Sequence, residues 1–132
     1  HGHIDDLARF VNEDTIITVV ESDPKDSNYK ALQDNLIRLQ NAKLENGKAP
    51  KIVCLPMPHK LEFDGLRLPA SYANFLILNK SVLVPVFNDP RDREALNIIA
   101  ECFPDRTVIP ISAIDLIWGF GTLHCLSQQI PA

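Results

Sequence analysis

The sequence predicts an α/β fold built from repeated strand-strand-helix-strand units. Three observations favour it: runs of β-branched residues, apolar positions at helical spacing, and the return of the same order after roughly 65 residues. The 132 residues suffice for one domain with a core and are too few for two. We therefore expect a single domain that contains two units and the beginning of a third.

The first unit is predicted to span residues 3–56. Thr15 to Val20 is rich in β-branched residues, and Glu13-Asp14 before it suits a tight turn. Tyr29, Leu32, Leu36 and Leu39 form an apolar stripe at three- and four-residue spacing. The expected elements are strands at 7–11 and 15–20, a helix capped by Asp26 or Ser27 and ended by Asn46-Gly47, and a strand at 51–55.

The second unit is predicted to span residues 70–111 and to repeat this order. Its expected elements are strands at 74–78 and 82–86, a helix at 91–102 and a strand at 107–111. The two units can be overlaid with Ala8-x-Phe10 on Ala73-x-Phe75 and Ser22-Asp23-Pro24 on Asn88-Asp89-Pro90.

A third unit is expected to begin at 121–126, within a segment that spans 119–132. Two units and a fraction resemble part of a propeller, because such units need neighbours to cover their open flanks. An ordinary α/β sandwich with accidental pairing is the alternative.

Composition excludes several functional classes. The net charge of −4 and the scattered Lys and Arg argue against nucleic-acid binding, and no apolar run is long enough to span a membrane. The three cysteines form no CxxC pair, so we expect no disulfides, a cytoplasmic location and no metal site. Cys54 and Cys102 are expected in the core. The opening His1-Gly2-His3 suggests a tag remnant or, preferably, a piece of a longer protein.

A candidate site arises if the segments that precede the first strands converge at one end of the units. These segments contain His3 and Asp5, then Asn74, and finally Gly121 and Cys125. A cysteine flanked by glycine can be exposed, and its thiolate is the reactive form. The alternatives are that the cysteine is a packed apolar residue and that Asp5 caps a backbone amide.

His124 is the poorer candidate for a general base. If residues 121–126 form a strand, adjacent side chains point to opposite faces, so His124 would point away from Cys125.

Several motifs resemble the agmatine deiminase and bacterial peptidylarginine deiminase family. They extend over essentially the whole chain, in the order of the family. They are Gly2-His3-Ile4-Asp5 with Leu7-Ala8-Arg9-Phe10, then Leu68-Pro69-Ala70-Ser71-Tyr72-Ala73-Asn74-Phe75, then Phe103-Pro104-Asp105-Arg106, and finally Leu123-His124-Cys125-Leu126-Ser127-Gln128-Gln129-Ile130-Pro131. The resemblance implies a pentein fold, a five-fold pseudo-symmetric α/β propeller, of which this chain is the C-terminal part.

The resemblance also implies a mechanism that needs no cofactor. Cys125 would attack the guanidinium carbon, His3 would act as the acid and base, and Asp5 would bind the guanidinium nitrogens. Asn74 and Gly121 are further candidates for substrate contacts. The product would be a ureido compound plus ammonia, formed from agmatine first and from peptidyl-arginine second.

Two departures from the family bear on this expectation. The family's second substrate-binding acid comes from an N-terminal half that this sequence lacks, so we expect the chain alone to be inactive. It would need that half, or another copy of itself, as a partner. Agmatine-specific members usually have a glycine-rich segment with an asparagine before the nucleophile, whereas Phe120 and Thr122 occupy that stretch here, which weakens the expectation of agmatine as substrate. A cysteine acyl hydrolase and a non-catalytic guanidine-binding module are the alternative functions.

Overall fold

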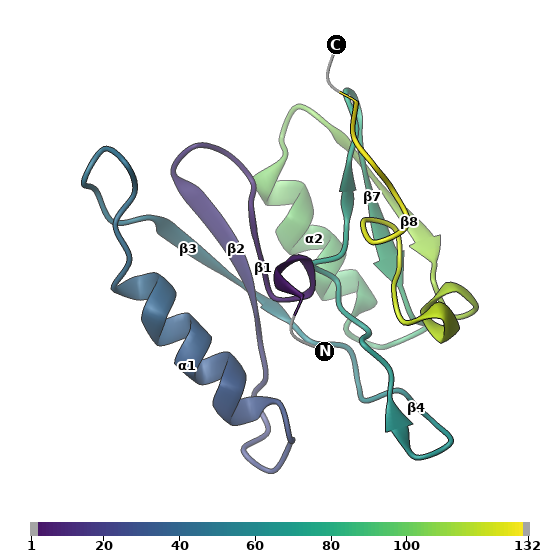
Figure 1. Cartoon of the computed structure of the whole chain (residues 1–132). Helices are drawn as coiled ribbons and strands as arrows, with labels where there is room; N and C mark the ends of the chain where they lie inside the picture. Colours follow the sequence, from purple (N-terminus) through teal and green to yellow (C-terminus); the bar gives the residue numbers. More distant parts are fainter. Residues whose placement is uncertain (1–2, 131–132) are drawn as a thin grey trace.

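The computed structural model describes residues 3–130 and contains two similar units joined by a small hairpin (Figure 1). The first unit consists of β1, β2, α1 and β3, and the second consists of β6, β7, α2 and β8. The elements are η1 (Ile4–Asp6), β1 (Ala8–Phe10), β2 (Thr15–Val20), α1 (Tyr29–Gln40), β3 (Lys51–Pro56), β4 (Glu62–Phe63), β5 (Leu66–Arg67), β6 (Leu76–Ile77), β7 (Ser81–Val86), α2 (Asp92–Cys102), β8 (Thr107–Ser112) and η2 (Leu116–Gly119).

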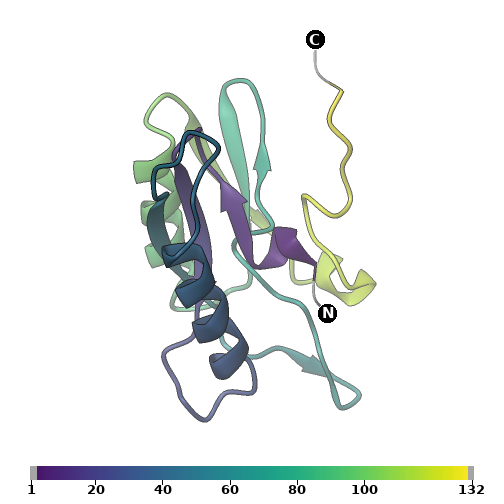
Figure 2. The same cartoon turned by 60° about the vertical axis from the view of Figure 1, so that its left-hand side comes forward.

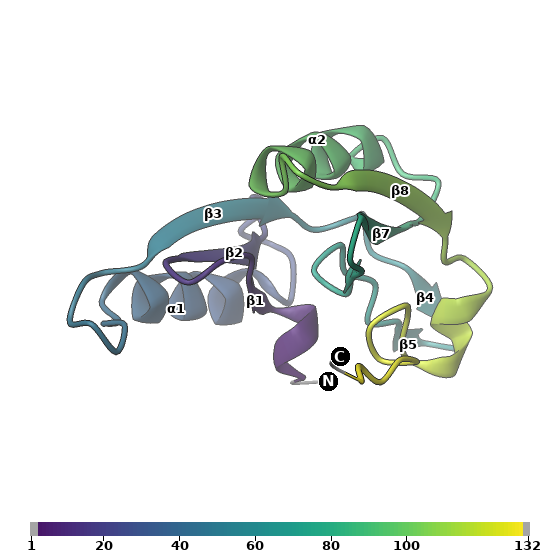
Figure 3. The same cartoon turned by 90° about the horizontal axis from the view of Figure 1, so that it is seen from above.

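Both units have the same sheet topology. In each, the first two strands are antiparallel, and a helix then crosses over so that the third strand lies parallel to the middle one. Parallel neighbours require such a crossover because both strands start at the same end of the sheet. Figure 3 shows the units side by side, with α1 below β2 and β3 and α2 above β8.

Most predicted elements are present near their predicted bounds. The strand at Thr15–Val20 is confirmed residue for residue. The other strands of the two units and α2 differ from the prediction by only one or two residues at an end. No helix within residues 3–130 combines the length and the apolar character that crossing a membrane requires.

The predicted end of α1 is wrong. The helix stops at Gln40, because the side chain of Asn41 donates a hydrogen bond to Ile37 O at 2.8 Å and so caps the last turn. Gly47 instead belongs to a later turn with a φ of 79°, and its N–H donates to Leu44 O at 2.8 Å. The prediction that Asp26 or Ser27 caps the helix is also wrong: the N-cap of α1 is Asn28, without a side-chain cap, and Asp26 Oδ1 instead accepts a hydrogen bond from Asn28 N at 2.7 Å in the preceding turn.

One apolar core extends through both units. It includes Ile17 of β2 and Val82 of β7, which are fully buried, and the residues that precede β6. Tyr72, Ala73 and Phe75 are each 0% exposed. Burial of a large apolar side chain stabilises a protein by roughly 1.5–3 kcal/mol, so these residues hold the backbone on both sides of position 74 firmly in place.

The expected strand at 121–126 is absent. The described residues there form turns, in which Leu126 N donates to Thr122 O at 3.1 Å and Ser127 N donates to His124 O at 3.0 Å. Because these backbone groups are paired locally, they form no ladder with a neighbouring strand. Residues 121–126 are called the C-terminal turn below.

The overlay of the first strands, Ala8-x-Phe10 on Ala73-x-Phe75, is wrong by two residues, whereas Ser22-Asp23-Pro24 on Asn88-Asp89-Pro90 keeps the offset of β2 and β7. Arg9 lies opposite Ile17, and Leu76 lies opposite Leu83. Ile17 and Leu83 are the third residues of the paired segments of β2 and β7, so Arg9 corresponds to Leu76. A shift of two residues keeps every side chain on the same face of the sheet, which is why the sequence pattern does not reveal it.

Cys54 is exposed, contrary to the prediction of a core position. It lies beside Thr18 in the parallel register, and Thr18 Oγ1 accepts a hydrogen bond from Asn35 of α1 at 3.0 Å. The helix α1 therefore contacts β2, while β3 is an edge strand of the sheet on which Cys54 remains exposed. Cys102 is partly buried against the core, and all three cysteines are free.

Candidate active site

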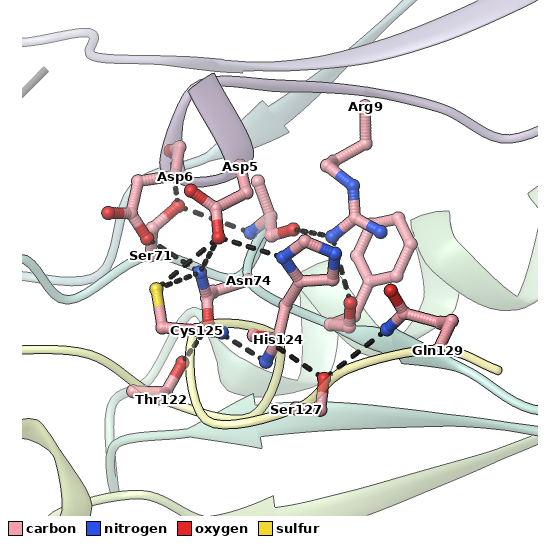
Figure 4. Close-up of polar contacts among 12 residues, drawn as sticks. Asp5, Asp6, Arg9, Ser71, Asn74, Thr122, His124, Cys125, Ser127 and Gln129 are labelled. Atoms are coloured by element: carbon pink, nitrogen blue, oxygen red, sulfur yellow. Dashed lines mark hydrogen bonds and ion pairs between the residues drawn. The ribbon is translucent and has the colours of Figure 1, made fainter. Parts of the chain in front are cut away.

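Three segments that are distant in sequence meet at one end of the two units. They are η1 before β1, the turn before β6, and the C-terminal turn. Figures 2 and 3 both show η1 (purple) facing the C-terminal segment (yellow). In the close-up, the side chains of Asp5, Asn74 and Cys125 point toward one another (Figure 4). The structure thus brings together four of the five candidate residues, since Gly121 packs against Cys125.

Asn74 is at the centre of this arrangement and is completely buried. Its Oδ1 accepts hydrogen bonds from Thr122 Oγ1 at 2.8 Å, His124 N at 3.0 Å and Cys125 N at 3.2 Å. Since backbone N–H groups can only donate, these bonds fix which end of the amide is oxygen. Asn74 therefore determines the conformation of the C-terminal turn.

The amide nitrogen of Asn74 faces the acidic side of the site. Nδ2 lies 3.1 Å from Asp5 Oδ2, 2.9 Å from Asp6 Oδ1 and 3.0 Å from Cys125 Sγ. Asp6 was not predicted as a site residue, although its place beside Asp5 in a Gly-His-x-Asp motif could have suggested it. The site accordingly contains two adjacent carboxyl groups.

Cys125 has an accessible position and a thiol that is protonated at rest. Sγ donates a hydrogen bond to Asp5 Oδ2 at 3.3 Å. Partial burial of the sulfur raises the pKa of the Cys125 thiol, Asn74 lowers it by donating a hydrogen bond, and Asp5 raises it. A cation bound beside the sulfur would favour the thiolate.

Asp5 is ionised despite its surroundings. Burial acts to raise its pKa, but hydrogen bonds from His124 and Cys125 outweigh burial and hold the pKa below its ordinary value of 3.8. The His124 ring contributes through Nδ1, which lies 2.8 Å from Asp5 Oδ2. Asp5 is therefore an anion suited to bind a cationic group.

The argument against His124 is wrong, because its premise was a strand. In a turn, neighbouring side chains can approach the same group, and both His124 and Cys125 hydrogen-bond to Asp5 Oδ2. His3, by contrast, is exposed, and none of the hydrogen bonds within residues 3–130 joins its imidazole to Cys125 or Asp5. A catalytic role for His3 remains a prediction.

Gly121 is buried beneath the cysteine. A Cβ atom at this position would lie 2.7 Å from Cys125 Cβ and 3.4 Å from Cys125 Sγ. Two carbon atoms that are not bonded to each other do not approach as closely as 2.7 Å, so a larger residue would displace the cysteine. The geometry therefore supports a packing role for Gly121, while the predicted substrate contact is untested.

Arg9 ties the first unit to the second. Its Nη1 donates to Ala73 O at 3.2 Å and to Phe75 O at 2.9 Å, and its guanidinium lies 4.8 Å from the centre of the Phe75 ring. Ser71 Oγ adds a hydrogen bond to Asp6 O at 2.7 Å. These contacts hold η1 against the turn that contains Asn74. The sequence placed Arg9 in the motif Leu7-Ala8-Arg9-Phe10 but did not indicate this contact.

The donor set could in principle hold a metal ion, since ligand atoms of Asp5, Asp6 and Cys125 lie within 4.8 Å of one another. However, Asn74 Nδ2 lies within 3.1 Å of an acceptor atom of each of the three groups and directs its two hydrogens among them. A donor hydrogen aimed at the same point would repel a cation, so the arrangement favours a hydrogen-bonded network. The absence of a metal remains a prediction.

A cavity of about 460 Å³ opens on the other side of Asp6. Apolar side chains such as Leu32 and Met57 and polar ones such as Arg67 line it. Arg67 Nη1 is 2.6 Å from Asp26 Oδ1, and this contact lowers the pKa of Asp26. Asp6 thus lines this cavity and also contacts Asn74 of the cysteine site.

These features define an α/β protein with a candidate cysteine site assembled from three segments. The chain belongs to the Porphyromonas-type peptidyl-arginine deiminase family, whose profile matches residues 1–131. This match confirms the resemblance inferred from the sequence motifs.

Individual relatives agree with this assignment. An agmatine deiminase from Stutzerimonas stutzeri is 33% identical over 149 residues, covering 99% of this chain and 40% of the relative. A crystal structure described as the putative arginine deiminase from Porphyromonas gingivalis superposes with a TM-score of 0.96 at 43% identity, over 98% of this chain and 38% of that one. The agmatine deiminase of Enterococcus faecalis gives a TM-score of 0.93 at 31% identity, over 98% and 40%. The chain spans about 40% of the length of the curated relatives it matches.

Proposed function

We propose that the protein containing this chain hydrolyses a guanidino group to a ureido group and ammonia. The observation that carries the proposal is the contact of Cys125 Sγ with both Asp5 and Asn74, at 3.3 and 3.0 Å, in a member of this family. A nucleophile, an anion for the substrate cation and a fixed amide are the groups that such a reaction requires.

The first step is attack of the Cys125 thiolate on the guanidinium carbon. A carbon–sulfur bond forms, and a carbon–nitrogen bond then breaks to release ammonia, which leaves an amidino-thioether on the protein. Water attacks this intermediate, and the carbon–sulfur bond breaks to give the ureido product and the free thiol. The net reaction consumes one water and releases one ammonia.

Asp5 and Asn74 prepare the site for this chemistry. The Asp5 carboxylate would exchange its contact with the thiol for a charge-assisted hydrogen bond to a guanidinium nitrogen. The bound substrate guanidinium lowers the free-energy cost of ionising Cys125, so the thiolate forms when the substrate is in the site. Asn74 Nδ2, 3.0 Å from the sulfur, is placed to donate a hydrogen to the thiolate.

We assign the role of general acid and base to His3, and His124 is the competing candidate. We propose that His3 protonates the leaving ammonia and then activates water, as the family resemblance implies. His124 is held by Asp5 through Nδ1. If His3→Gln leaves turnover nearly unchanged and His124→Gln abolishes it, the assignment to His3 is wrong.

The complete protein is proposed to form a pentein propeller, with this chain as its C-terminal part. An N-terminal part would contribute a second substrate-binding acid, and the 132-residue chain alone would be inactive. We expect a cytoplasmic protein, and association with further copies is compatible with its exposed strand edges.

The test measures ammonia release by the full-length protein from agmatine and from an arginine peptide. Cys125→Ser should abolish turnover of the preferred substrate, because a hydroxyl at this position is a much weaker nucleophile than a thiolate. Cys54→Ser is the matched control and should leave the rate unchanged. Full activity of Cys125→Ser would overturn the covalent mechanism. Ligand binding without any turnover would indicate the non-catalytic module instead.

A further inference from the structure

The amide nitrogen of Asn74 has more hydrogen-bond acceptors around it than it has hydrogens to donate. It carries two hydrogens, and three acceptors lie within 3.1 Å of it: Asp5 Oδ2, Asp6 Oδ1 and Cys125 Sγ. The amide cannot rotate to relieve this shortage, because donors occupy its oxygen. Three groups therefore compete for two hydrogens.

The outcome depends on the protons of the three groups. Asp5 is anionic, and at rest the Cys125 thiol supplies its own hydrogen, which it donates to Asp5 at 3.3 Å. When the sulfur ionises, it loses that hydrogen and needs one from Asn74. Asp6 Oδ1, at 2.9 Å from the same nitrogen, then competes with the sulfur.

We propose that Asp6 is a positioning residue for Cys125, which competes with the sulfur for the Asn74 hydrogens and whose charge controls how readily the thiol ionises. The inference rests on the proposed function, because it concerns the readiness of the nucleophile. A neutral Asp6 leaves the Asn74 hydrogens to Asp5 and Cys125, and an anionic Asp6 withdraws one and repels the thiolate.

The surroundings of Asp6 raise its pKa, so that its charge changes within the pH range in which the reactivity of Cys125 can be measured. Burial, and next the charge of Asp5, raise the pKa of Asp6 to about 6, while Asn74 and His3 act in the opposite direction. From the C-terminal turn, the titratable group in contact with the same amide is Cys125.

Three further ionisable groups lie on neighbouring elements. Arg9 of β1 interacts electrostatically with Asp5 and Cys125, and His124 is hydrogen-bonded to Asp5. Arg67 of β5 lines the cavity beside Asp6 but is paired with Asp26 at 2.6 Å. None of these contacts supplies Asp6 with a hydrogen in place of Asn74 within the described residues.

The experiment measures alkylation of Cys125 by iodoacetamide in the full-length protein, from about pH 5 to pH 9, because only the thiolate reacts. Mass spectrometry of the Cys125 peptide gives the rate, and the exposed Cys54 in the same sample is the internal reference. Asp6→Asn retains the shape of the side chain, Asp6→Ala removes the acceptor, and Asp105→Asn is a control at an exposed position.

Both Asp6 variants should alkylate Cys125 about three- to tenfold faster than wild type near pH 7.5, as a thiol pKa lower by about 0.5–1 unit would produce. Asp105→Asn should match wild type. Unchanged Cys125 profiles in both Asp6 variants would overturn the proposal. If the variants do not fold, a wild-type profile that follows a single titration, without an inflection near pH 6, would also overturn it. Alkylation needs no turnover, so this result is independent of whether ammonia is released.

Discussion

The two units share a topology but place different chemistry before their first strands. The first unit presents two carboxyl groups, Asp5 and Asp6, on a short turn of 3-10 helix that is partly open to solvent. The second unit presents the amide of Asn74, which is completely buried. A neutral amide with every bond satisfied can be buried at little cost, whereas a carboxylate cannot. The second unit, through the buried Asn74, therefore fixes the geometry of the site, and the first unit supplies its negative charge through Asp5 and Asp6.

The helices show the same difference in burial. α2 contacts β8 and also β3 of the other unit, and it buries Ala95 and Ile99 completely. α1 contacts β2 and buries only Leu32, and Ile37 is 53% exposed. Within this chain, the helix of the second unit is therefore packed more tightly than the helix of the first. Tight packing suits the unit that holds Asn74 in place.

The largest effect is expected from making the second unit acidic like the first. Asn74→Asp would lose both hydrogens directed at Asp5, Asp6 and Cys125 and would add a third carboxyl group. Removing a single preorganised donor of this kind lowers kcat by about 10²–10³-fold, and we expect at least that loss in ammonia release. Asn79→Asp, in the exposed turn between β6 and β7, is the control. Activity within threefold of wild type would show that Asn74 is not central.

The next effect compares the two helices directly. Ile99→Ala should reduce the free energy of unfolding by about 2–5 kcal/mol, because it leaves a cavity in a closed core. Ile37→Ala removes the same atoms from a side chain that is half exposed, so the loss should be below about 1 kcal/mol. Urea denaturation of the full-length protein measures both values. Equal losses would mean that another part of the protein buries Ile37.

A smaller effect is expected at the contact between the units. Arg9→Met retains much of the apolar stem but leaves Ala73 O and Phe75 O without their donor, at a cost of about 1–3 kcal/mol. Arg93→Met, on the exposed face of α2, should change the free energy of unfolding by less than about 0.5 kcal/mol. Chemical denaturation compares the two. If both variants are as stable as wild type, Arg9 does not hold the units together.

The smallest effect concerns the charge of the first unit. Folding raises the pKa of Asp6 from 3.8 to about 6, so its protonated form is favoured in the folded state. The contribution of Asp6 protonation to the free energy of unfolding is complete below pH 3.8 and is lost as the pH rises through about 6. Because Asp6 is partly solvated, we expect Asp6→Asn to be more stable than wild type by about 1–2 kcal/mol at pH 8 and similar to it at pH 4. Thermal melting at both pH values tests this sign, and a variant less stable than wild type at pH 8 would contradict it.

Much of the fold could be predicted from local patterns. β2 was found residue for residue, because a run of β-branched residues indicates a strand wherever it is packed. The errors at the end of α1 and at 121–126 occurred where a hydrogen bond to a side chain decides the outcome. Asn41 ends α1 earlier than the apolar stripe suggests, and Asn74 Oδ1 binds the backbone of the C-terminal turn in place of a neighbouring strand.

The sequence by itself determined the order of the elements, the membership in a deiminase family, and Asp5 and Cys125 as candidate site residues. Only the tertiary structure decided that Asn74 is central, that Asp6 and His124 belong to the site and that Arg9 joins the units. The physical reason is distance along the chain. His124 and Asp5 are separated by 119 positions, and a hydrogen bond of 2.8 Å between them leaves no trace in the residues on either side.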